Sequence, residues 1–265
     1  MKRYIAIFTA ILLANIAFAQ EQAAEDTQAQ ALATSPAESW EAANEAYNKG
    51  EYSQAATLYE SILDSEMHSA KLYYNLGNAY FKQEKLGMAI LNYNRALRLA
   101  PGDEDIIHNL EYATAATKDQ IEEIPEFFLK KWWAAMRNIM GCNGWTIASL
   151  AVLALTLAAA LVYLLSQVLS LRKVGFYCMC IGMVVFITST IFACQTRQAL
   201  VGGGEGVILS SAAPVKSSPD RAATDLFVLH EGTKLTLGEQ IDGWAEIRIA
   251  DGRKGWIETS RIEII

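Results

Sequence analysis

The sequence predicts a multidomain protein: an all-α repeat solenoid, an α-helical hairpin that crosses a membrane, and a small all-β barrel. Residues 43–67 fall on residues 77–101 when they are moved along the chain, and this period of about 34 residues indicates stacked helix–turn–helix units. Two long stretches without charge follow. After residue 207 the pattern changes to short segments that alternate between apolar and polar residues, which is typical of strands.

Composition agrees with this division. Of the 265 residues, 52% are hydrophobic, and they concentrate at the N-terminus and between Trp132 and Cys194. This clustering points to membrane segments and not to one large core. The net charge is −7 and the sequence has no basic face, so we expect no nucleic-acid partner.

The second repeat, residues 69–101, resembles the tetratricopeptide repeat (TPR) closely. Small residues let the paired helices approach, large ones fill the space between helices, and a proline stops the second helix. The matching residues are Tyr73, Leu76, Gly77, Tyr80, Ala89, Tyr93, Ala96 and Pro101. The first repeat is weaker, with Ala43 in place of glycine and Met67 in place of proline, and residues 103–120 continue the frame. We therefore predict a TPR domain over residues 39–120.

In the TPR family the first helix of each unit lines a concave groove, so the resemblance implies a set of partner-binding positions. They are Asn44, Tyr47, Lys71, Tyr74, Asn75, Asn78, Lys82 and Asn109. Asparagine amides offer both donors and an acceptor to a peptide. Trp40 stands where carboxylate-clamp TPRs carry a basic residue, which argues against recognition of a terminal carboxylate. A solvated groove without a specific ligand is the alternative.

The N-terminal segment has the pattern of a secretory signal. Lys2 and Arg3 precede an apolar core, and small residues at Ala17 and Ala19 form a cleavage site, which predicts a signal peptide over residues 1–19. An uncleaved anchor is the alternative. Residues 20–38 are polar and have little bulk, so we predict a flexible linker.

Residues 141–171 and 174–196 carry no charge, and each is long enough to span a bilayer. We predict spans over 145–171 and 174–196, with Arg172 and Lys173 in the turn between them. Residues 124–140 mix aromatic and basic side chains. They predict an amphipathic helix on the membrane surface, or alternatively an extension of the first span. The signal and two spans together predict an inner-membrane protein with both soluble regions on the periplasmic side.

The C-terminal region, residues 207–265, contains two Gly-Trp pairs around a hairpin turn, Asp251-Gly252. This spacing is similar to bacterial SH3 domains, and residues 214–219 depart from the family's usual first-strand motif. The resemblance implies a small barrel whose groove takes cell-wall peptides or other proteins. Trp244 and Trp256 are the candidate groove residues, and plain barrel packing is the alternative.

No catalytic or metal-binding constellation is apparent, so we predict a non-enzyme without catalytic residues, metal or cofactor. His68, His108 and His230 are scattered, and Cys178 and Cys180 lie within an apolar run without histidine or acid nearby. We interpret these thiols as small apolar side chains. A redox sensor built on the two cysteines is the alternative.

The order of signal, TPR, tight hairpin and SH3-like region resembles the BatE type of membrane protein from bacterial aerotolerance operons. The specific resemblances are residues 109–111, 128–133 and 171–176. That family is associated with membrane proteins carrying von Willebrand A domains. The resemblance implies a scaffold that binds proteins in an envelope complex linked to aerotolerance or stress survival. The alternative function is a membrane-tethered module that binds peptidoglycan peptides.

Overall fold

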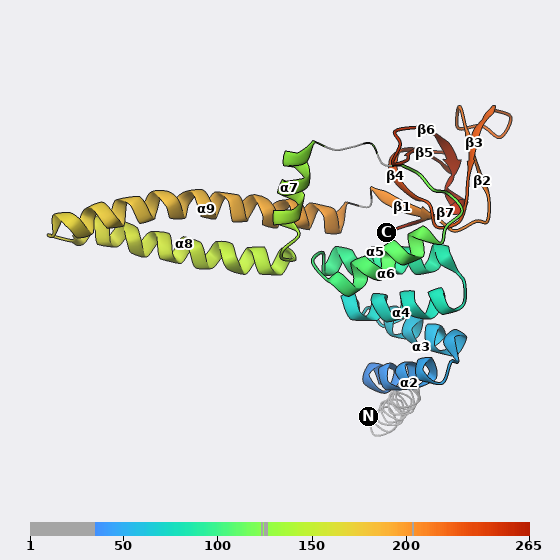
Figure 1. The fold of residues 1–265 in the computed structure, drawn as a ribbon, viewed down its shortest axis with the longest axis horizontal. Coiled ribbons are helices and arrows are strands. Elements are labelled where there is room, and N and C mark those ends of the chain that lie inside the picture. The colour runs from blue at the N-terminus through green and yellow to red at the C-terminus, as the bar shows by residue number, and fades with distance from the viewer. Residues whose placement is uncertain (1–34, 123, 125–126, 203) are drawn as a thin grey trace, which may run out of the picture. The chain divides into compact units, whose positions relative to one another are not determined.

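The computed structural model describes residues 35–122, 124, 127–202 and 204–265. The chain divides into two compact units between Glu66 and Met67 (Figure 1). The predicted signal peptide, residues 1–19, lies outside the described residues, as does the predicted linker up to residue 34.

The first unit is a pair of helices, α2 (Pro36–Asn48) and α3 (Tyr52–Asp64). Ser35 and Glu38 form a capping box in which each side chain accepts a hydrogen bond from the other's backbone N–H. Helix α2 therefore begins at Pro36, inside the segment predicted as linker. The side chains buried in the pair are Ser39, Ala43, Ala46, Ala55, Ala56, Tyr59 and Ile62.

The second unit opens with three helices, α4 (Ala70–Lys82), α5 (Leu86–Leu99) and α6 (Glu104–Ala115). Ser69 and Asp103 cap α4 and α6 through side-chain oxygens that accept backbone N–H bonds. A Cβ on Gly77 would lie 2.7 Å from the Tyr93 ring, so only glycine lets α4 and α5 approach this closely. The small-and-large pattern of the second repeat thus packs as predicted.

The next part of the second unit contains a short helix, α7 (Phe128–Arg137), and two long helices that run side by side in Figure 1, α8 (Cys142–Leu165) and α9 (Leu169–Val201). Both long helices have the length and apolar composition needed to cross a membrane. The turn between them falls at residues 166–168, so its predicted position at Arg172 and Lys173 is wrong. Both residues lie in the first turns of α9, where the Arg172 guanidinium sits 5.7 Å from the centroid of the Tyr163 ring.

Small residues bring α8 and α9 together. A Cβ on Gly175 would lie 2.9 Å from the Tyr163 backbone nitrogen, and one on Gly182 would lie 2.3 Å from the Thr156 hydroxyl. The buried polar side chains of the pair are Ser149, Thr156, Ser189 and Thr196. Close approach through small residues is the usual way in which membrane helices pack, because lipid provides no hydrophobic drive between them.

The C-terminal region is a seven-stranded antiparallel sheet with the order β3-β2-β6-β5-β4-β1-β7 (Figure 1). Its strands are β1 (Glu205–Ile208), β2 (Ala213–Lys216), β3 (Asp225–Leu229), β4 (Lys234–Ile241), β5 (Trp244–Arg248), β6 (Lys254–Glu258) and β7 (Ile262–Ile264). A two-residue turn, Asp242-Gly243, joins β4 to β5 with φ values of 47° and 81°, as a type I′ hairpin requires. The predicted turn at Asp251-Gly252 lies in the longer β5–β6 connection.

One face of this sheet carries the core: Ile208, Ala213, Val215, Leu229, Leu235, Ala245, Ile247, Ile249 and Ile257. The period-two alternation predicted for β4, β5 and β6 accounts for these alternate positions. Among the described residues no pairing joins the edge strands β3 and β7, so the sheet is open. The predicted closed, SH3-like barrel is not confirmed.

Candidate partner-binding surfaces

The predicted groove residues fall in both units. In the second unit, α4 and α6 meet through a chain of hydrogen bonds. The Tyr93 hydroxyl donates to Asn78 Oδ1 over 2.7 Å, and Asn109 Nδ2 donates to Asn78 Oδ1 over 3.0 Å and to the Tyr74 hydroxyl over 2.9 Å. Asn78 and Asn109 therefore hold helices together. Their role in binding a partner stays a prediction, because an asparagine that packs and one that binds carry the same side chain.

The first unit contains the same bond one period earlier. The Tyr59 hydroxyl donates to Asn44 Oδ1 over 2.7 Å, and each member of this pair lies 34 positions before its counterpart in the pair Tyr93–Asn78. The weak first repeat is thus a structural repeat in which asparagine again anchors a buried tyrosine. Tyr47, the other candidate of this unit, stacks edge-to-face on Tyr52 with ring centroids 5.3 Å apart.

The remaining candidates form the accessible part of the α4 surface. Lys71 and Lys82 are exposed, and the eleven positions between them are about three helical turns, so they share one side of α4. Tyr74 and Asn75 are half-buried between them. Exposed Tyr112 of α6 packs edge-to-face on Phe81, with centroids 5.6 Å apart. These groups offer positive charge and aromatic surface to a partner.

The sheet carries a second surface on the face opposite its core. Glu246 pairs in register with Trp256, and Trp244 pairs with Glu258, so these four side chains share one face, while Ala245, their neighbour on β5, belongs to the core. Trp256 is half-buried and Trp244 is buried at 8% exposure. Trp256 is therefore the more accessible of the two candidate groove residues.

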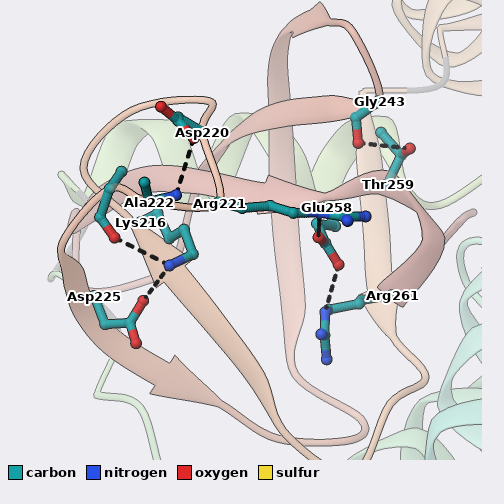
Figure 2. A network of polar contacts seen from close by, with 10 residues as sticks. Lys216, Asp220, Arg221, Ala222, Asp225, Gly243, Glu258, Thr259 and Arg261 are labelled. Atoms are coloured by element: carbon teal, nitrogen blue, oxygen red, sulfur yellow. Dashed lines mark hydrogen bonds and ion pairs between the residues drawn. The ribbon is translucent and has the colours of Figure 1, made fainter.

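Charged residues border this tryptophan face (Figure 2). Glu258 accepts hydrogen bonds from Arg261 and Arg221, each over 3.2 Å, and the Arg261 bond is the main cause that lowers the pKa of the Glu258 carboxyl. Lys216 on neighbouring β2 donates to Asp225 over 2.8 Å. The result is an aromatic surface beside paired, oriented charges, a combination that suits a polar peptide.

The structure also shows a junction between the helices and the sheet that the sequence did not reveal. It is centred on Asp119, just after α6. One carboxylate oxygen of Asp119 accepts from the His230 backbone N–H over 2.6 Å and from the Thr233 hydroxyl over 2.7 Å, and the other lies 2.6 Å from His230 Nδ1. Burial alone would raise the pKa of Asp119, but the hydrogen bonds from His230 and Thr233 outweigh it and lower that pKa.

The β3–β4 turn completes the junction by fitting against α5. Glu231 Oε1 accepts the Gly87 backbone N–H over 2.8 Å, and so satisfies one free N–H of the first turn of α5, which has no side-chain cap of its own. Gly232 has φ of +86°, and a Cβ there would lie 2.6 Å from Thr117 Cγ2 and 2.9 Å from Ile90 Cδ1.

The junction leaves a cavity of about 520 Å³ between α5, α6 and the β3–β4 turn. Aliphatic side chains such as Ile90 and Ile121 line it together with Asn94, Thr117 and Thr233, which are buried. Asn94 Nδ2 donates to the Ile90 carbonyl, so this amide is held within its own helix. The specific contacts between the helices and the sheet therefore surround a cavity, and the two parts do not pack tightly over the whole junction.

Two arginines of α5 extend the junction to α9 and the last strand. Arg98 donates to the carbonyls of Ala199 and Leu200 at the C-terminal end of α9, and to the Ile265 carbonyl. The last carbonyls of a helix lack partners within it, and a cation there is favourable. Arg95 donates to the Ile264 carbonyl over 2.7 Å and pairs with Glu263.

Within the described residues, no group of three or more His, Cys, Asp or Glu side chains lies close enough together to hold a metal ion. Cys178 and Cys180 are two positions apart on α9, and residues so spaced point to different sides of a helix. That placement counts against the alternative of a redox pair.

Comparison with known families agrees with the helical region. Residues 70–103 match the tetratricopeptide repeat, which covers α4, α5 and the turn after them. No curated protein matches the chain. TPR modules bind other proteins, so the match supports a protein-interaction scaffold.

Proposed function

We propose that this chain is a non-catalytic, membrane-anchored scaffold that holds partner proteins on its TPR groove and on its sheet. The observation that carries the proposal is the TPR match over residues 70–103, whose first helix presents exposed lysines beside aromatic surface. The junction at Asp119 supports a scaffold, because it joins the helices of the second unit, which carry the α4 surface, to the sheet.

The chemistry of the groove suggests the kind of segment it binds. Lys71 and Lys82 offer two positive charges about three turns apart, with Tyr74 and Asn75 between them. An extended partner segment with acidic side chains at both ends complements this arrangement, and electrostatic complementarity raises both specificity and the rate of association.

The proposed location follows from the hairpin and the N-terminal pattern. Helices α8 and α9 cross the inner membrane, and both soluble regions lie on the periplasmic side. The BatE resemblance adds an envelope complex linked to aerotolerance or stress survival, with von Willebrand A-domain membrane proteins of the same operon as partners. A reporter enzyme active only in the periplasm, fused after residue 265, is expected to be active.

The scaffold is tested by co-purification of such a von Willebrand A-domain protein with the full chain in detergent. Lys71→Glu combined with Lys82→Glu reverses the groove charge and is expected to lower recovery at least about tenfold. Lys85→Glu changes the charge of an exposed lysine in the turn between α4 and α5, outside both proposed surfaces, and is expected to leave recovery unchanged. Equal recovery with all three forms would reject the groove as the contact.

A second candidate function is the binding of peptidoglycan peptides, favoured by the shared face of Trp244 and Trp256 and the adjacent Glu258 pairs. Retention of the full chain on purified peptidoglycan is the test. Loss of retention in Trp256→Ala, with retention kept in Lys71→Glu, favours the peptide-binding module. Absence of retention in the unaltered chain favours the protein scaffold.

A further inference from the structure

Helix α7 has one apolar and one basic side. At about 100° per residue, Phe128, Trp132 and Leu129 fall on one side, and Lys130 and Arg137 fall on the other. Trp132 is 62% exposed, Phe128 66% and Leu129 51%, so the soluble parts of the protein do not cover this apolar side. The helix contains no acidic residue.

Aromatic packing fixes α7 to the hairpin. The Trp133 ring meets the Phe192 ring edge-to-face with centroids 4.7 Å apart, and the Trp145 ring lies 4.8 Å from Phe192 on another side. Phe192 is 1% exposed, although most large side chains of α9 are open. Trp145 Nε1 donates to the Arg137 carbonyl over 2.7 Å, which ties the end of α7 to the first turn of α8. In Figure 1, α7 crosses α9 near this end of the hairpin.

The contact between α7 and α9 lies where the uncharged stretch of α9 ends. Trp133 Nε1 donates to Gln195 over 3.2 Å, and Arg197 is the first charged residue after the uncharged stretch 174–196 of α9. Helix α7 also ends at Arg137 and α8 begins at Cys142, so α7 is a separate helix and not an extension of the first span. Tryptophan is enriched at this boundary in membrane proteins because its ring is apolar and its N–H is polar.

We propose that α7 lies in the surface plane of an anionic bilayer, with Phe128, Leu129 and Trp132 at the acyl-chain boundary and its basic side among lipid phosphates. This inference rests on the proposed membrane anchoring by α8 and α9. Trp133 joins α7 to the hairpin through Phe192, and the three positive charges of α7 complement anionic headgroups. The aromatic contacts fix the position of α7 relative to the end of the hairpin. Helix α7 therefore stays at the membrane surface when the protein binds a partner.

The test uses the full chain reconstituted in vesicles of phosphatidylcholine with phosphatidylglycerol. The four native cysteines are replaced by alanine and single cysteines are introduced as Leu129→Cys, Lys131→Cys, Leu157→Cys or Ser218→Cys. A membrane-impermeant maleimide then measures exposure. Leu129→Cys samples the apolar side of α7, and Lys131→Cys samples the exposed flank about 160° around the helix from Leu129. Leu157→Cys samples the middle of α8, and Ser218→Cys samples the sheet. We expect Leu129→Cys to react at least about tenfold more slowly than Lys131→Cys, since its side chain is withdrawn into the lipid.

The outcomes distinguish the proposed position of α7 from the membrane anchoring by α8 and α9 on which it rests. If Leu129→Cys reacts as fast as Lys131→Cys while Leu157→Cys stays protected, the membrane anchor holds and the α7 inference is overturned. If Leu157→Cys reacts as fast as Ser218→Cys, the anchoring itself fails. Protection of Leu129→Cys that is the same in pure phosphatidylcholine vesicles would reject the anionic preference.

Discussion

Gly232 offers the sharpest test of the junction between helices and sheet. A side chain at this position is strained by its φ of +86°, and a Cβ would also enter the space of Thr117 Cγ2 at 2.6 Å and Ile90 Cδ1 at 2.9 Å. Neither neighbour yields easily, because Ile90 is 1% exposed and Thr117 is β-branched and buried. The left-handed backbone costs about 1–2 kcal/mol and the overpacking about 1–3 kcal/mol.

Gly243→Ala is the matched control for Gly232→Ala. Gly243 has φ of +81°, but nothing lies within 4 Å of a Cβ built there. The control therefore carries the backbone strain without the clash, about 1–2 kcal/mol, against a total of about 2–5 kcal/mol for Gly232→Ala. At about 2–4 °C per kcal/mol, we expect Gly232→Ala to melt several degrees below Gly243→Ala.

Amide hydrogen exchange of the full chain in detergent locates this effect. The Gly87 N–H donates to Glu231 and the His230 N–H donates to Asp119, so both amides report on the junction. We expect faster exchange at both in Gly232→Ala and unchanged exchange at both in Gly243→Ala. Equal melting temperatures for the two variants, or unchanged exchange at Gly87 in Gly232→Ala, would refute a tightly packed junction.

Four further substitutions probe individual contacts. Because the folded-state pKa of Asp119 is lowered, its stabilisation is present above its ordinary pKa of 3.8 and is lost as the pH falls below that value. Asp119→Asn is therefore expected to lower the melting temperature at pH 7 and to lose this effect in melts below pH 3.8; a pH-independent loss contradicts it. Asn78→Ala and Asn44→Ala each remove a tyrosine hydrogen bond and should cost about 0.5–1.5 kcal/mol by urea unfolding, whereas Asn48→Ala, exposed at the end of α2, should stay within about 0.5 kcal/mol. Arg98→Ala removes the bonds to the last carbonyls of α9 and is expected to lower the free energy of unfolding by about 1.5–3 kcal/mol. Faster amide exchange in the last turn of α9 is the expected result.

The fold was predictable where local pattern and packing agree. Gly77, Ala89 and Tyr93 meet because the repeat needs small residues opposite large ones, and those residue types are visible in the sequence. The two long helices and strands β4, β5 and β6 follow from apolar length and alternation. Such features depend mainly on neighbours close along the chain.

Features that depend on distant partners escaped prediction. The turn before α9 was placed at Arg172 because charge normally marks the end of a span, yet the Tyr163 ring accommodates the guanidinium one turn inside the helix. Asn78 was assigned to a ligand because nothing local shows that the Tyr93 hydroxyl uses it. The hydrogen bonds between Asp119 and His230 span 111 positions, so no sequence window contains both.

Long-range contacts also hold the glycine-rich segment that follows α9, residues 202–206. The Gly204 carbonyl accepts from Leu237 of β4 over 2.8 Å, and Gly206 pairs with Leu235. Arg98 of α5 meanwhile holds the carbonyls at the end of α9 and that of Ile265. Helix α9, the second repeat and the sheet are therefore joined by contacts that do not depend on the glycines. Because Arg98 bonds both the end of α9 and the last strand, the C-terminal end of α9 is held to the helical repeat as well as to the sheet.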